Sequence, residues 1–105
     1  MPTPPSLSPE QRALALEKAT RVRKERAEVK RELKDGATSL SAVLERAERS
    51  EAIAKMRVLA LLEALPAMGK IKARRLLDQV GISEARRVQG LGANQRAELL
   101  RIVGS

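Results

Sequence analysis

The sequence predicts an all-α fold, and three observations support that prediction. Apolar residues recur at the three- and four-residue spacing of amphipathic helices along most of the chain. Residues that start helices, such as Ser before Pro or Leu, and residues that stop them, such as Gly after a helical run, flank these segments. No stretch of useful length alternates β-branched and polar residues, so no sheet is expected.

The first predicted element is a long helix within residues 8–35. A Pro-rich tail at residues 1–7 precedes it, and we expect that tail to be disordered. Ser8 suits the N-cap, a proline follows at the first helical position, and Gln11 completes a capping box. Gly36 provides the signal that ends the helix.

The apolar stripe of this helix is thin, and Arg26 interrupts it. We therefore expect the helix to project from the body in its first half and to dock in its second half. Its basic residues are dense at Arg21, Arg23, Lys24, Arg26, Lys30 and Arg31, and five glutamates from Glu10 to Glu32 offset their charge. One interpretation is a solvated helix with weak i,i+4 ion pairs, such as Glu17 with Arg21. The other is a basic arm that lies along a nucleic-acid backbone.

Residues 36–105 are expected to form one compact helical domain, because a chain of 105 residues can bury only one modest core. Its helices are predicted at residues 39–48, 50–54, 55–64, 69–79 and 93–103. The inward-facing residues are expected to include Leu40, Val43, Leu44, Ala47, Ile71, Ala73, Leu76, Leu77, Val80, Ala97, Leu99, Leu100 and Val103. Lys55 and Arg57 stand at the start of a helix, where the helix dipole disfavours cations, which suggests another use for them.

The composition narrows the functional classes. A net charge of +8 and a pI near 10.8 favour a polyanion as partner. The chain has no Phe, Tyr or Trp, so it lacks the platforms on which single-stranded bases stack. It also has no Cys and no His, so we expect neither an enzyme nor a bound cofactor or metal. Because no long apolar run or signal peptide is present, we expect a cytoplasmic protein with no membrane partner.

The segment 65–77 is the most informative part of the chain for function. It has the pattern of a helix end, a tight turn (residues 65–69, here called turn one) and the start of a basic helix. A helix N-terminus favours negative charge, and Lys70 and Lys72 lie on its first helical turn. This pattern is typical of a phosphate-binding hairpin, in which the N–H groups of residues 68–70 are expected to face a phosphate.

The last third of the chain resembles the helix-two-turns-helix module found in a ribosomal small-subunit head protein and in some DNA glycosylases. The resemblance covers residues 65–103 and rests on Met68-Gly69-Lys70, Ala73, Leu76-Leu77, Gly81-Ile82, Arg87-Val88, Gly90-Leu91, Gln95 and Leu99. It implies that turn one holds a phosphate with its backbone amides. The module usually has glycine on both sides of the hydrophobic turn residue, and Ala67 takes the first of these positions. A positive φ there would cost alanine about 1 kcal/mol.

Over residues 7–104 the chain is similar to the actinobacterial integration host factor family. The stretches behind this resemblance are residues 7–13, 16–19, 26–30, 55–58, 60–66 and 86–92. It implies a nucleoid-associated protein that binds duplex DNA through the phosphate backbone with little sequence specificity. Such a protein would alter DNA shape or supercoiling and support phage site-specific integration. Two positions depart from the family: Leu59 stands where serine is usual, and Gln89 where a basic residue is common.

The predicted site is one basic surface formed by two turns. The second turn (residues 88–92) is expected to bring the preceding Arg86 and Arg87 to the DNA backbone or into a minor groove. The candidate DNA-binding residues are Lys55, Arg57, Pro66, Ala67, Met68, Gly69, Lys70, Lys72, Arg74, Arg86, Arg87 and Gln89. Arg74 and Arg75 diverge by about 100° on their helix, so one of them is expected to be solvated. About four to six neutralised phosphates would give a log–log salt slope of about −4 to −5.

Two other classes share parts of this pattern. The alternative is an RNA-binding ribosomal-type protein with the same module, in which a long basic C-terminal tail would be expected. A DNA glycosylase would use an N-terminal proline as nucleophile, but Thr3 rather than an acidic residue follows Pro2, and there is no cysteine for a zinc finger. The expected partners are double-stranded DNA in the nucleoid and a phage integrase–DNA complex, and the protein is expected to be a monomer in solution.

Overall fold

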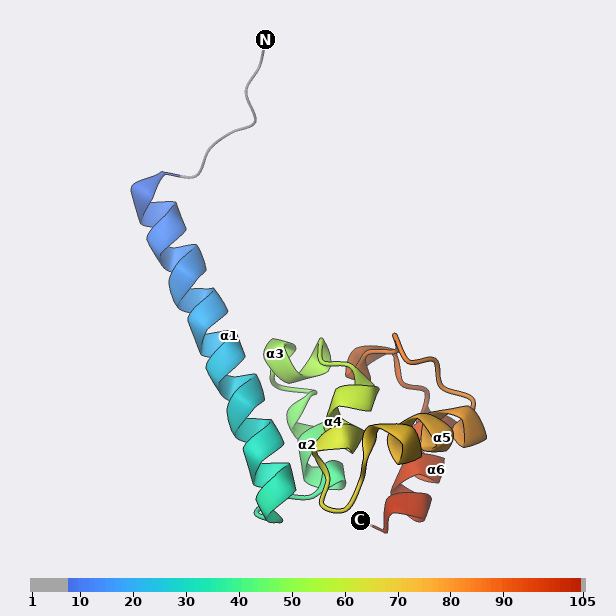
Figure 1. The fold of residues 1–105 in the computed structure, drawn as a ribbon. Coiled ribbons are helices and arrows are strands. Elements are labelled where there is room, and N and C mark those ends of the chain that lie inside the picture. The colour runs from blue at the N-terminus through green and yellow to red at the C-terminus, as the bar shows by residue number, and fades with distance from the viewer. Residues whose placement is uncertain (1–7, 105) are drawn as a thin grey trace.

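The computed structural model describes residues 8–104 and confirms the predicted all-α architecture. A long helix, α1 (Pro9–Asp35), extends away from a compact body that the other helices form (Figure 1). The principal extents of 53 × 31 × 24 Å reflect this projecting arm. The tail at residues 1–7, predicted to be disordered, lies outside the described residues.

Both ends of α1 are fixed by the predicted local signals. The Ser8 hydroxyl accepts a hydrogen bond from the Gln11 amide at 3.1 Å, and the Gln11 side chain accepts one from the Ser8 amide at 2.9 Å. Gly36 closes the helix in the left-handed region at φ 73°. The first half of α1 is exposed, whereas Val29 and Leu33 are fully buried, so the projecting first half and docked second half are confirmed.

Polar contacts add to the docking of α1. The Arg26 Nε donates to the carbonyl of Ala52 at 2.9 Å, and the Ser50 hydroxyl donates to the Glu25 carboxylate at 2.7 Å. Arg26 interrupts the apolar stripe because it reaches the backbone of α3 (Glu51–Ala54), the helix that packs beside it. These two bonds fix the direction in which the arm leaves the body.

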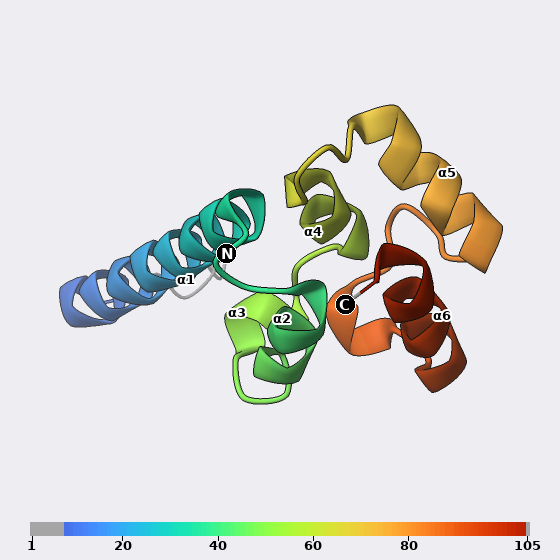
Figure 2. The ribbon, with the colours of Figure 1, turned by 90° about the horizontal axis from the view of Figure 1, so that it is seen from below.

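The body is a ring of short helices around an aliphatic core. In chain order these are α2 (Leu40–Arg46), α3, α4 (Val58–Ala64), α5 (Lys70–Val80), the 3₁₀ helix η1 (Val88–Gly90) and α6 (Ala93–Val103). α4 packs between α1 and α5, while α5 meets α6 and α2 meets both α3 and α6 (Figure 2). The fully buried side chains at the centre are Val29, Leu33, Leu40, Val43, Ile53, Val58, Leu61, Leu62, Ala73, Leu77 and Leu99.

Three details of the sequence prediction are wrong. The helix predicted at residues 55–64 begins at Val58, because the chain before it runs extended and pairs with a distant segment. Ile71, predicted to face inward, is 68% exposed. Ala97 of α6 is exposed as well. In α5 and α6 the apolar spacing gave the direction of the buried face but overestimated its width.

Two left-handed positions provide a test of backbone strain. Ala67 has φ 60°, a conformation unfavourable for alanine, and Gly81 at the end of α5 has φ 84°. We expect Ala67→Gly to raise the free energy of unfolding by about 0.5–1 kcal/mol, since relieved strain exceeds the added unfolded-state entropy. Gly81→Ala should lower it by about 1–2 kcal/mol. Urea denaturation followed by circular dichroism measures both, and a destabilised Ala67→Gly variant would contradict the assignment.

Candidate nucleic-acid interface

Arg57 and Arg87 lie directly opposite each other in an isolated antiparallel β-bridge. Two backbone bonds form it, from the Val58 amide to the Arg86 carbonyl at 3.0 Å and from the Val88 amide to the Met56 carbonyl at 2.9 Å. These bonds flank the arginine pair, so the two arginines occupy a non-hydrogen-bonded position, in which opposed side chains come closest together. Residues that are 30 positions apart thus form one local cluster.

The neighbours of the two arginines decide which way they point. Met56, Val58 and Val88 are buried, and successive side chains of extended chain alternate between faces. Arg57 and Arg87 are exposed and project to the opposite, solvent side. Neither is ion-paired with a carboxylate of residues 8–104. Like charges directly opposite each other are unfavourable, so an anion between the guanidinium groups would stabilise the pair.

Turn one offers a different kind of anion site. The Met68 amide donates to the Leu65 carbonyl at 3.2 Å inside the turn, so the prediction that this N–H faces a phosphate is wrong. Gly69 is the N-cap of α5, and no side chain caps the helix. The backbone amides of residues 70–72 have no hydrogen-bond acceptor within residues 8–104. The amide of Gly69 also has no acceptor within residues 8–104, so the free amides begin at Gly69, one residue later than predicted.

Arg86 differs from its neighbour Arg87. Its Nη1 donates to the carbonyl of Gly90 and to the Gln95 side chain, both at 3.0 Å. Gln95 also accepts from the Gly92 amide and donates to the carbonyl of Gly81. This network joins the end of α5, the second turn and the start of α6. Sequence reasoning missed it because its members lie on three segments that come together only in the fold.

Comparison with known proteins identifies the family. Residues 33–102 match the S13-like H2TH domain family. The chain is 54% identical over 101 residues to the integration host factor of Streptomyces coelicolor, covering 96% of this chain and 94% of the relative. It is 52% identical over 101 residues to that of Mycobacterium tuberculosis, covering 96% of both. The chain belongs to the actinobacterial integration host factor family. Its fold is also similar to a solved structure of sIHF bound to an 8-bp palindromic DNA, with a TM-score of 0.81, 50% identity, and coverage of 84% of this chain and 99% of that one.

Two further cations of the predicted site are ion-paired in this member of the integration host factor family. Lys55 Nζ lies 2.7 Å from Glu51 Oε1, and Arg74 Nε lies 2.9 Å from Glu84 Oε1. The hydrogen bond from Lys55 and its charge lower the pKa of the Glu51 carboxyl from its ordinary value. Arg74 is the paired member of the divergent pair, and Arg75 is exposed without an ion-pair partner in the described part of the chain.

The rest of the predicted set lies at the surface around the two turns. Pro66, Gly69, Lys70, Lys72 and Gln89 are exposed, as is Ala67. Because turn one follows α4 and Arg57 precedes it, the two anion sites lie at opposite ends of that helix. α4 has seven residues and a rise of about 1.5 Å each, so the helix between the two candidate sites is about 10 Å long. The structure thus divides the single predicted surface into two sites.

Across residues 8–104, no helix is long and apolar enough to span a membrane. Nor do three or more Asp or Glu side chains cluster there in a way that could hold a metal ion.

The adjacent arginines should differ in what they contribute to stability. Arg86→Ala removes two hydrogen bonds of a partly buried network, so we expect the free energy of unfolding to fall by about 1–2 kcal/mol. Arg87→Ala removes one of two opposed like charges, so stability should change by no more than about 0.5 kcal/mol, and upward if at all. Thermal unfolding of the two single variants measures the difference, and equal losses would contradict the distinct roles.

Proposed function

We propose that this protein binds duplex DNA through the phosphate backbone, with residues 36–105 as the DNA-binding domain. The Arg57–Arg87 pair is the observation that carries the proposal. The backbone bridge sets these two exposed arginines opposite each other, and neither is ion-paired with a carboxylate of residues 8–104. Guanidinium groups suit bidentate recognition of phosphate. Family membership and the similarity to DNA-bound sIHF support the same partner.

The proposed binding mode uses both ends of α4. The arginine pair takes one phosphate, and the free amides at the start of α5, with Lys70 and Lys72, take another beyond the far end of α4, a helix about 10 Å long. The length of this helix is comparable to the width of a DNA groove, so the proposal places the two phosphates on the two sides of one groove. Arg86 acts through the second turn by holding Arg87 in place.

Little sequence preference is expected from this surface. Among Asn94, Gln95 and Arg96, the nearest approach to a base-reading set, two side chains have internal partners. Gln95 belongs to the network with Arg86, and Arg96 Nη1 lies 3.6 Å from Glu48 Oε1. Phosphate contacts position a protein without reading sequence. The proposed consequences are altered DNA shape and supercoiling in the nucleoid and support of phage site-specific integration, by a protein that is a monomer in solution.

A double variant tests the proposal. Arg57→Ala/Arg87→Ala should weaken binding to duplexes of unrelated sequence about tenfold or more and make the salt slope less steep by about 2, from about −4 to −5 in the wild type. Arg21→Ala/Arg49→Ala removes the same charge from exposed residues away from both sites and serves as the matched control. Fluorescence anisotropy across a salt series gives both quantities.

The contrary outcomes are distinct. If the wild type fails to bind duplex DNA at low salt, or if both double variants lose affinity equally, the arginine pair is not the binding site. Tighter binding to an A-form RNA duplex of matched sequence than to DNA would instead favour the ribosomal-type alternative.

A further inference from the structure

The solvent-facing side of α1 carries five cations and no acid. With 100° between successive residues, these cations all point within about 60° of the direction of Ala27. They are Arg23, Lys24, Lys30, Arg31 and Lys34, here called the arm face, and all are exposed. The acids of α1 nearest to this direction are Glu17 and Asp35, at about 80°, and Glu28, at about 100°. The glutamates counted along the helix therefore do not offset the charge on this side.

The acidic residues of α1 are directed elsewhere, two of them into contacts with the body. Glu25 accepts from Ser50, and Glu32 lies 3.5 Å from Arg46 of α2. The ion pair expected between Glu17 and Arg21 is not formed, and no residue of the arm face is ion-paired within residues 8–104. The interpretation of α1 as a helix laced with its own ion pairs is thus not what the structure shows.

The arm face is continuous with turn one. A surface groove of about 700 Å³ is lined on one side by Lys30, Arg31 and Lys34, and on the other by the end of α4 and residues 65–69. Glu63 is the only acid in that lining, against three cations. A phosphate backbone held at turn one therefore has a positively charged path from that turn onto α1.

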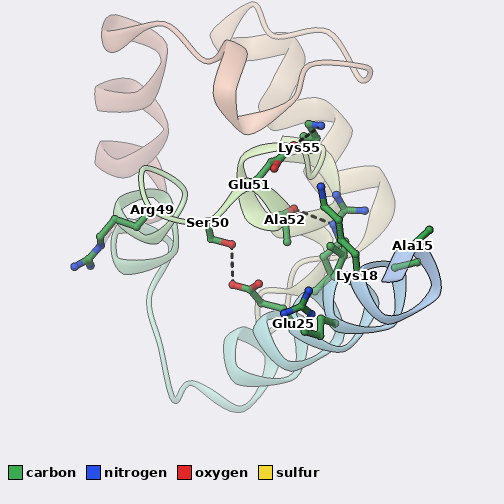
Figure 3. A pocket seen from close by; sticks show the side chains of 12 residues that line it. Ala15, Lys18, Glu25, Arg49, Ser50, Glu51, Ala52 and Lys55 are labelled. Carbon is green, nitrogen blue, oxygen red and sulfur yellow. Dashed lines mark hydrogen bonds and ion pairs between the residues drawn. The ribbon is translucent and has the colours of Figure 1, made fainter. Parts of the chain in front are cut away.

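The opposite side of α1 holds the arm in a fixed direction. Figure 3 shows Glu25 bonded to Ser50 in the groove between α1 and α3, a groove also lined by Lys18 and Arg49. Together with the buried Val29 and Leu33, this contact fixes which way the arm face points. A rigid helix does not have to be ordered on binding, so less of the interaction free energy is lost.

We propose that the arm face binds the phosphate backbone of the same duplex that turn one holds, extending the contact along α1. This inference rests on the proposed function. From residue 23 to residue 34 the face spans about 16 Å, which corresponds to about five base pairs of duplex.

The test compares two triple variants of the full chain that each remove three positive charges. Lys30→Gln/Arg31→Gln/Lys34→Gln removes the part of the arm face beside turn one. Lys18→Gln/Arg21→Gln/Arg49→Gln removes three cations that line the groove on the other side of α1 and is the control. All six side chains are exposed, so both variants should keep the wild-type circular dichroism spectrum and melting temperature within about 3 °C.

For the arm-face variant we expect a salt slope less steep by about 2 to 3, an affinity about tenfold lower, and an occluded site on long duplex DNA shorter by about two base pairs per protein. The control should change the slope by less than about 1 and leave the site size unchanged. Equal losses in the two variants, or no loss in the arm-face variant, would overturn the inference. The Arg57→Ala/Arg87→Ala result judges the proposed function separately, because that variant leaves the arm face intact.

Discussion

The candidate interface depends on two backbone hydrogen bonds that tie the chain before α4 to the chain before η1. The bonds of Val58 and Val88, at 3.0 and 2.9 Å, join segments that are separated by α4, turn one and the whole of α5. Met56, Val58 and Val88 fill the core on one side of this junction. Because extended residues alternate, burial of these three forces Arg57 and Arg87 to the outside together. The apolar core therefore sets the spacing of the charges.

This arrangement opposes the stability of the free protein. Like charges on directly opposed residues repel each other, and the backbones of Arg57 and Arg87 cannot separate without breaking the bridge that the core supports. The left-handed Ala67 adds strain at the other end of α4. Both unfavourable features flank the same seven-residue helix. Elsewhere in the chain the local sequence signals agree with the fold. The opposed arginines and the left-handed Ala67 are exceptions, and both lie where a polyanion is proposed to bind.

The fold was largely predictable because its helix ends are determined within a few residues. Ser8, Ser39 and Ser50 each cap a helix by accepting an amide hydrogen bond three residues on, and Gly36 and Gly81 end helices in the left-handed region. The start of α4 was missed because the residues before it look helical in pattern but are held extended by a partner 30 positions away. Exposure at Ile71 and Ala97 was missed because periodicity gives no measure of how far neighbouring helices reach.

The candidate site was predictable in composition but not in roles. The basic turn, the glycine before α5 and the arginines before the second turn are all visible in the sequence. The different roles of Arg86 and Arg87 are not visible in the sequence. The carbonyl of Gly90 and the side chain of Gln95 come within reach of Arg86 only after α5 and α6 have packed. The same holds for Arg74, whose partner Glu84 follows the end of its own helix.

The charges of α1 also take positions that only the folded structure shows. The net charge of a segment says little about a helix, because a rotation of 100° per residue can sort opposite charges onto separate faces. In α1 the docking side takes up Glu25 and Glu32, while the five cations of the arm face are left facing solvent. Docking and charge segregation therefore have one cause: the contacts that fix the arm to the body are also those that remove acids from its outer face. A change that loosened the contact at Arg26 or Ser50 would then alter both the angle of the arm and the field that it presents to a polyanion.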